Sequence, residues 1–194
     1  MPSNTTTAIA ALAVTAGAVF MNEDPSPIDS SLFTATGEAM PEIDIEAVIA
    51  TDPMTAWRGW VSPDVIDAAM GVETDFDLRI GGKYEYYFGA DLPEGLKGSE
   101  DCQILSYVPG QMLSFSWNAP PSIPETRDLR TWVVVTFSPE TSTDNDRAQT
   151  RIRLQHIGFG PIGNKNEAWA KTRAYFEAAW PQVLAAHREH FAED

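Results

Sequence analysis

The 194-residue chain has a single cysteine, Cys102, and few basic residues. A lone cysteine excludes an intramolecular disulfide and a metal site built from several cysteines. Against 28 aspartates and glutamates stand 13 lysines and arginines, which gives a net charge of −15. Nucleic acids and anionic membrane surfaces are bound through basic surfaces, so this charge argues against both as partners. The acidic residues are spread along the chain, as is typical of a solvated surface.

The motifs of several common enzyme classes are missing as well. The chain has neither standard glycine-rich phosphate loop, no Gly-x-Ser-x-Gly pattern and no recognisable Ser/His/Asp signature. His187 and His190 are three residues apart, but no second motif supplies further zinc ligands at a suitable spacing. We therefore expect no metal and no cofactor, and we assign no catalytic residue.

The longest apolar run lies near the N-terminus, at residues 8–21. Its 14 residues are too few to span a bilayer, so no membrane-spanning helix is expected. Small residues at positions 16–18 suit the cleavage site of a signal peptide of about residues 1–18, but the preceding segment has no lysine or arginine, which such signals normally carry. Export to the periplasm and a cytoplasmic location both stay open. A disordered alanine-rich extension and a true start at Met21 are further interpretations.

A polar, proline-bearing segment continues to residue 40 and is typical of a linker. One folded domain is expected over residues 41–194, which is long enough to bury a sizeable core.

The domain is predicted to begin with a strand and two short helices. Residues 42–50 alternate apolar and acidic side chains, which indicates a half-buried strand. Thr51 and Asp52 can cap the first helix, while a Ser-Pro pair at residues 62–63 and Gly71 bound the second.

Six further strands are predicted, with glycine-containing turns at residues 81–82 and 109–110. They are expected at residues 73–80, 83–89, 99–108, 112–117, 130–138 and 150–159. Alternation of apolar and solvated side chains along them is typical of an antiparallel sheet.

A long amphipathic helix is predicted after Asn164, because apolar residues recur every three or four positions there. Pro181 lies inside this pattern and lacks a backbone donor, so we expect it to kink or split the helix near Ala179.

The expected fold class is therefore α+β. A single curved antiparallel sheet of seven strands carries two short helices after its first strand, and the long C-terminal helix packs across the sheet over a cavity. A concave, mostly apolar space of this kind is the usual place for a ligand. The hairpin of residues 98–121 is predicted to form a wall of the cavity, with a proline-stiffened rim loop at its end.

Several segments, taken in this order, resemble one superfamily. They are AWRGWVSPDVI (residues 56–66), GGKYEYYF (81–88), the hairpin of residues 98–121, RTWVVVTF (130–137), LQHIGFG (154–160) and YFEAAWPQVL (175–184). Together they resemble the SRPBCC superfamily, with the START-like helix-grip fold shared with birch-pollen-allergen-like proteins. Within it, they are most similar to the group named after the activator of the heat-shock-protein-90 ATPase.

This resemblance covers roughly residues 42–191. It implies the helix-grip fold and, in different branches of the superfamily, hydrophobic-ligand binding, lipid transfer or aromatic-cyclase chemistry. No catalytic motif of this group transfers to the chain residue by residue.

Aromatic residues and one histidine are the candidate ligand-binding residues. The aromatic candidates, which are also typical of an ordinary core, are Trp60, Tyr84, Tyr86, Phe115, Trp117, Phe159, Trp169 and Phe176. His156 is predicted to face inward beside Ile152 and Leu154, where a neutral imidazole can hydrogen-bond a ligand or carry a proton. The alternative is a core histidine satisfied by backbone or by a carboxylate.

Three hypotheses about function follow. The first is non-catalytic binding of a small hydrophobic molecule between the sheet and the C-terminal helix. The second, implied only by the resemblance, is a module that interacts with a chaperone ATPase as its protein partner. The third is a cyclase- or hydrolase-like enzyme that uses His156 as an acid or base.

Overall fold

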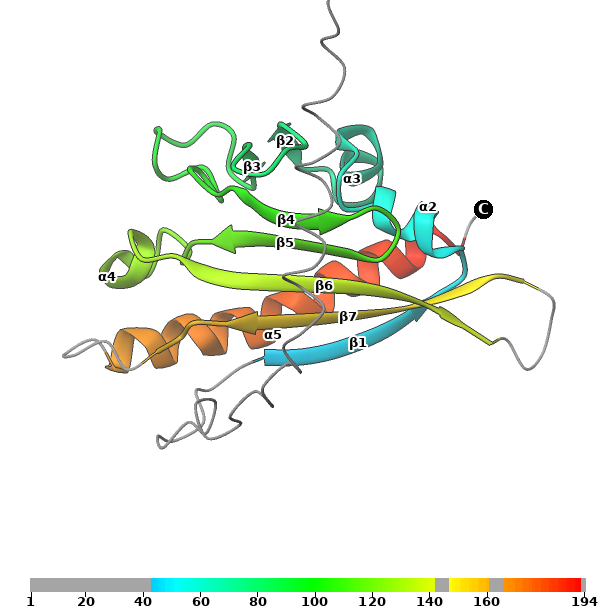
Figure 1. The fold of residues 1–194 in the computed structure, drawn as a ribbon. Helices are drawn as coiled ribbons and strands as arrows, with labels where there is room; N and C mark the ends of the chain where they lie inside the picture. The colour runs from blue at the N-terminus through cyan, green and yellow to red at the C-terminus, as the bar shows by residue number, and fades with distance from the viewer. Residues whose placement is uncertain (1–42, 142–146, 161–165, 193–194) are drawn as a thin grey trace, which may run out of the picture. The chain divides into compact units, whose positions relative to one another are not determined.

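The computed structural model describes residues 43–141, 147–160 and 166–192, all of which belong to one compact unit, Met40–Asp194. The leader and linker expected over residues 1–40 lie outside the described residues. With the labels of Figure 1, the elements are β1 (Ile43–Ile49), α2 (Pro53–Arg58), α3 (Pro63–Met70), β2 (Glu73–Phe76), β3 (Tyr84–Tyr87), β4 (Ile104–Val108), β5 (Met112–Trp117), α4 (Pro124–Arg127), β6 (Thr131–Glu140), β7 (Gln149–Ile157) and α5 (Asn166–His190).

The strands form two sheets, which corrects the prediction of a single seven-stranded sheet. Five strands pair antiparallel in the order β1-β7-β6-β5-β4, while β2 and β3 form a separate hairpin. An isolated bridge between Lys83 and Gln103 links this hairpin to the larger sheet. The α+β class, the antiparallel pairing and the C-terminal helix are as predicted, and the short helix α4 was missed.

The ladder between β3 and β4 is interrupted because a side chain replaces a backbone acceptor. The backbone N–H of Tyr86 donates to Ser99 Oγ at 2.8 Å, and the Ser99 N–H donates to the Tyr86 carbonyl at 2.9 Å. Next to it, Gly98 lies so close to the Tyr86 carbonyl oxygen that a Cβ would be 1.8 Å from it. Residues 99–101 therefore form a turn instead of continuing the predicted strand, and pairing resumes at Cys102, whose carbonyl accepts the Tyr84 N–H at 2.9 Å.

The two faces of the larger sheet differ, as the alternation predicted. On β7, Ile152, Leu154 and His156 are fully buried, whereas Arg151 and Arg153 are exposed. On the exposed face Arg151 binds Glu46 at 2.8 Å, and each such solvent-exposed pair adds at most about 1 kcal/mol.

Helix α5 covers the buried face (Figure 1). Its apolar side chains recur at helical spacing; those buried are Trp169, Phe176, Trp180 and Leu184, and the buried Phe191 follows directly after the helix. Trp180 packs against Trp117 of β5, which in turn packs against Tyr86 of β3, so interlocking rings fill most of the space that was predicted to be a cavity.

Pro181 does not split the helix, which runs unbroken as an element from Asn166 to His190. A proline frees the carbonyl of the residue four positions earlier, here Glu177. Both Pro181 and Glu177 are exposed, so water can bind that carbonyl. The buried Trp180 and Leu184 on either side of the proline hold both halves of the helix on the sheet.

Asp52 caps α2 through its side chain, which accepts hydrogen bonds from the backbone N–H groups of Met54 (2.9 Å) and Thr55 (3.1 Å). These contacts and the Thr55 hydroxyl hold the pKa of Asp52 below its usual value. Replacing Asp52 with alanine should lower the free energy of unfolding by about 1 kcal/mol. Urea unfolding of Asp52→Ala beside Asp64→Ala, which alters an exposed acid at the start of α3, measures the cap alone. An equal decrease in the free energy of unfolding in the two variants would contradict a stabilising role of the Asp52 cap.

Within residues 43–141, 147–160 and 166–192, none of the helices is both long enough and apolar enough to cross a bilayer.

Candidate binding site

A pocket of about 170 Å³ lies where the β3–β4 loop (residues 88–103), the loop after β5 (residues 118–121) and α5 meet. We call it the rim pocket. Its lining is mainly apolar and consists of Phe88, Gly89, Leu92, Leu96, Lys97, Gly98, Ser99, Trp117, Asn118, Pro120, Pro121, Tyr175 and Phe176.

The floor of the rim pocket is the end of the aromatic core. Trp117 and Phe176 are both buried, and each packs against Trp180, with ring centroids 5.5 and 5.8 Å apart. A ligand in the pocket therefore meets rings that the fold already holds in place.

Large apolar side chains surround the mouth of the rim pocket and remain in contact with solvent. Phe88 is 59% exposed, Leu92 48%, Leu96 41% and Tyr175 47%. Single exposed apolar residues are common, but a group of them around a pocket is typical of a surface that another molecule covers.

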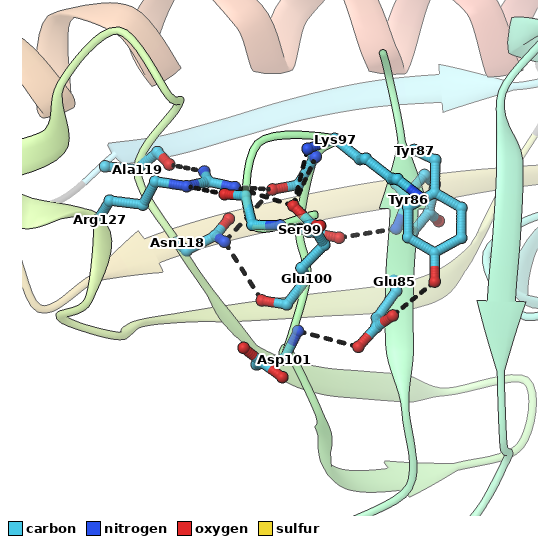
Figure 2. Close-up of polar contacts among 12 residues, drawn as sticks. Glu85, Tyr86, Tyr87, Lys97, Ser99, Glu100, Asp101, Asn118, Ala119 and Arg127 are labelled. Carbon is cyan, nitrogen blue, oxygen red and sulfur yellow. Dashed lines mark hydrogen bonds and ion pairs between the residues drawn. The ribbon is translucent and has the colours of Figure 1, made fainter. Parts of the chain in front are cut away.

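Glu100 holds the β3–β4 loop in shape (Figure 2). Its Oε1 accepts a hydrogen bond from the Gly95 N–H at 2.5 Å, and its Oε2 accepts one from the Lys97 N–H at 2.7 Å and one from the Gly98 N–H at 3.3 Å. A carboxylate that accepts several backbone N–H groups satisfies donors that a loop would otherwise leave unpaired.

Arg127, on α4, joins this loop to the opposite wall (Figure 2). Its guanidinium donates to the carbonyl oxygens of Gly95 (2.8 Å), Gly98 (2.9 Å) and Ala119 (2.5 Å), and lies 3.2 Å from the Glu100 carboxylate. The side chain is only 10% exposed. One buried cation thus fixes both walls of the rim pocket relative to each other.

A second set of contacts holds the turn after Glu100. Asp101 has φ of 61°, a left-handed conformation that is unfavourable for most residues. Its N–H donates to Glu85 Oε1 at 2.9 Å, and the Tyr87 hydroxyl donates to Glu85 Oε2 at 2.6 Å. Burial and the neighbouring Glu85 raise the pKa of Tyr87, so its hydroxyl keeps its proton and stays a donor.

His156 faces inward as predicted and is fully buried, with a hydrogen-bond partner at each ring nitrogen. The Trp180 indole N–H donates to Nδ1 at 2.9 Å, and Nε2 lies 2.6 Å from Thr131 Oγ1. Because the Thr131 hydroxyl donates to the Trp117 carbonyl at 3.0 Å, Nε2 carries the proton and donates to Thr131. Burial lowers the pKa of His156 to about 3, so the ring is neutral. The partners are side chains of the core and include no carboxylate.

Four of the predicted residues also border a small internal void of about 10 Å³. We call it the inner void. It is lined by Trp60, Met70, Tyr86, Phe88, Phe115, Trp117, Trp180 and Val183.

The remaining predicted residues are buried in the core. Tyr84 stacks on Phe76 with centroids 4.7 Å apart, and its hydroxyl donates to the Trp60 carbonyl at 2.9 Å. Phe159 and Trp169 contact each other with centroids 6.4 Å apart, and neither belongs to the linings of the rim pocket or the inner void. Of the predicted set, Trp117 and Phe176 line the rim pocket.

Sequence reasoning missed three residues at the mouth of the pocket, namely Leu92, Leu96 and Tyr175. Leu92 and Leu96 lie in a segment rich in glycine, proline and charge that indicated only a loop, and Tyr175 falls beside the apolar stripe of the helix. The one available signal was the pair of leucines in that loop, because large apolar side chains are not expected in a loop that is solvated on all sides.

Cys102 behaves as a small buried hydrophobe. Its side chain is fully buried, and burial raises the pKa of the thiol to about 12. Across the described ranges, histidine, cysteine and acidic side chains do not gather in groups of three or more that could hold a metal ion.

A broader hollow of about 330 Å³ lies between β1 and α5, bordered by Ile45, Ala47 and Leu184 and by the charged Glu46 and Arg188. It has no aromatic lining. The rim pocket combines apolar walls, aromatic floor and braced loops, and is therefore our candidate site.

Residues 50–191 match the family described as Activator of Hsp90 ATPase homolog 1-like protein, AHSA1. The chain belongs to this family. AHSA1-like proteins are members of the SRPBCC helix-grip superfamily, so the resemblance seen in the sequence is confirmed. The comparison with curated proteins gave no match.

Solved structures share this AHSA1 fold. A protein from Mesorhizobium loti superposes with a TM-score of 0.60 at 22% identity, covering 79% of this chain and 98% of its own. A protein from Arthrobacter aurescens gives 0.56 at 17% identity, covering 79% and 87%. The Aha1 dimer from Colwellia psychrerythraea gives 0.50 at 14% identity, covering 78% and 96%. At these identities the likeness is one of fold alone.

Proposed function

We propose that residues 41–194 form a non-catalytic domain that binds a small hydrophobic molecule in the rim pocket. The observation that carries this proposal is the pocket itself, whose floor is Trp117 and Phe176 and whose mouth exposes four large apolar side chains. An engineered apolar cavity of about 150 Å³ is known to take up benzene. The rim pocket, at about 170 Å³, is thus large enough for one aromatic ring or a short aliphatic chain.

Binding without catalysis is favoured by the state of the reactive groups. His156 is neutral and has both nitrogens occupied, Cys102 is buried with a raised thiol pKa, and the Ser99 hydroxyl bonds to the backbone of β3. A general base needs reach to its substrate and a pKa near the working pH. The cyclase- or hydrolase-like alternative that uses His156 therefore has the least support.

A second candidate is a module that interacts with a chaperone ATPase, and its support is membership of the AHSA1 family. Adding purified Hsp90 and measuring its ATPase rate tests this candidate directly. An unchanged rate at saturating protein would contradict it, while leaving the small-molecule proposal in place.

The binding proposal predicts that one chemical class will stabilise the full chain in a thermal-shift screen of fatty acids, sterols, flavonoids and single-ring aromatics. A ligand at about 100 times its Kd adds about 2.7 kcal/mol, which raises Tm by about 5–10 °C for a domain of this size. Leu96→Arg, which places a charge at the mouth, should abolish the rise.

Leu105→Arg is the matched control, because Leu105 is also 41% exposed and lies on β4, outside the lining of the rim pocket. It should keep the full rise in Tm. A flat response to every class, or equal loss in both variants, would contradict binding at the rim pocket.

A further inference from the structure

The indole N–H of Trp60 is a buried hydrogen-bond donor without a protein acceptor. Trp60 is only 2% exposed and lines the inner void, and in the described part of the chain its Nε1 has no partner. Leaving a buried donor unsatisfied costs about 1–3 kcal/mol. Buried polar groups in native folds are normally paired with protein, ordered water or a bound molecule, and the described residues supply no partner here.

No neighbouring polar group of the described residues is placed to accept from this N–H. The Tyr84 hydroxyl donates to the Trp60 carbonyl (2.9 Å), and the Tyr86 hydroxyl, 3.1 Å away, donates to Tyr84. Both hydroxyl oxygens keep acceptor capacity, but neither is in hydrogen-bonding geometry with the Trp60 N–H. His187 stacks flat on Trp60 with centroids 4.9 Å apart and an interplanar angle of 19°, which places its ring over the indole face.

The inner void and the rim pocket share two lining residues, Phe88 and Trp117. Trp117 is buried and makes ring contacts with several neighbours, whereas Phe88 is largely exposed and stacks on Tyr86 at 6.0 Å. Exposed side chains change rotamer within picoseconds to nanoseconds. Phe88 can therefore swing outward and join the two spaces.

Both spaces border α5. The rim pocket contacts Phe176 on α5, and the inner void contacts Val183 on the same helix. Seven residues at 1.5 Å each put these contacts about 10 Å apart. Met70, at the inner end, is flexible and can adapt to a guest that enlarges the void.

The chemistry of the inner end selects the ligand. The described residues that line the inner void are all uncharged, and burying an ionised group there would be strongly unfavourable. An indole N–H only donates, so its partner must be an acceptor. We propose that the ligand is an elongated, uncharged molecule, about 10 Å long, whose apolar body lies in the rim pocket and whose single acceptor oxygen passes Phe88 to bind the Trp60 N–H. This inference rests on the proposed function of the rim pocket.

Three probes of similar length test the proposal on the full chain. Benzylacetone carries a ketone, n-butylbenzene carries no oxygen and phenylbutyrate carries a carboxylate. In the ¹H–¹⁵N spectrum the ketone should move the Trp60 indole signal, while n-butylbenzene should not. The ketone should also bind about fivefold more tightly than n-butylbenzene, as expected for one hydrogen bond, and phenylbutyrate at least about tenfold more weakly than the ketone.

Trp60→Phe removes the N–H and keeps an aromatic ring, and it should make the ketone and n-butylbenzene bind equally. Trp132→Phe is the matched control, because Trp132 is exposed on β6 and lines neither space. The indole shift in the unaltered chain keeps the test valid if Trp60→Phe unfolds.

The outcomes separate the two proposals. Equal binding of ketone and n-butylbenzene to the unaltered chain without an indole shift overturns this inference and leaves the rim pocket as a binding site. Preference for phenylbutyrate also overturns it, because the ligand would then be charged. Failure of all three probes to bind at millimolar concentration overturns this inference, and the thermal-shift screen then decides separately whether the rim pocket binds another class.

Discussion

Replacing Arg127 with methionine is expected to lower the free energy of unfolding by about 3–5 kcal/mol, the range for breaking one partner out of a buried ion pair. The substitution removes donors to three carbonyl oxygens and the contact with Glu100, and leaves that carboxylate, 12% exposed, without its cation. Methionine keeps much of the apolar stem, so the loss reports the guanidinium. Urea unfolding followed by circular dichroism measures it.

Arg79→Met is the matched control, because Arg79 pairs with Asp77 on the exposed loop after β2. It should cost less than about 1 kcal/mol. Arg127→Met should also abolish ligand-induced stabilisation at temperatures where the domain stays folded, since Arg127 connects the two walls of the rim pocket. A loss below about 1 kcal/mol in both variants would mean that the loops keep their shape without this residue.

Lowering the pH from 8 to 5 is expected to remove about 4 kcal/mol of stability through two histidines. Burial lowers the folded-state pKa of His156 to about 3 and that of His187 to about 4, the latter with help from His190. An unfolded histidine has a pKa of about 6.5 and takes up a proton first. The stability is therefore complete above pH 7, falls as the pH drops through 6.5, and stops falling near the folded values. Each histidine contributes about 2 kcal/mol at pH 5.

His187→Leu should remove about half of this pH dependence at little cost at pH 8. Among the described residues neither buried ring nitrogen of His187 has a hydrogen-bond partner, so an apolar side chain of similar size loses only the stacking on Trp60. His190→Leu, a change three residues later at a partly exposed position, should leave most of the dependence in place. Equal slopes of stability against pH in His187→Leu and the unaltered chain would contradict this account.

Local sequence patterns predicted the helices and strands well, because the alternation of side chains, the helix caps and the turns depend on residues close together in the chain. The alternation on β7 placed His156 inward, Asp52 caps α2, and Gly71 ends α3 in a left-handed conformation, as the residue types indicated. The order of the elements was enough to reach the antiparallel α+β fold.

What the sequence could not show depends on contacts between distant residues. The ladder between β3 and β4 ends because Ser99 reaches the Tyr86 backbone, and a serine in a predicted strand carries no sign of this. Glu100 and Arg127 lie 27 residues apart, and no local pattern indicated that they contact each other. Pro181 was predicted to kink or split α5 because proline lacks a backbone donor. The helix continues because Pro181 is exposed and its neighbours are buried, and only the fold shows this. Three residues at the mouth of the rim pocket were missed for the same reason.

The inertness of Cys102 has a practical consequence. The chain's one thiol is buried beside the junction of the hairpin with the larger sheet, and its raised pKa leaves it a protonated, poor nucleophile at neutral pH. A second cysteine engineered at any exposed position would therefore react alone with a maleimide, so that a fluorophore or spin probe can be attached without first removing the native residue. The Cys102 thiol itself can be alkylated only when this part of the sheet opens. Its rate of alkylation therefore measures how often that local opening occurs.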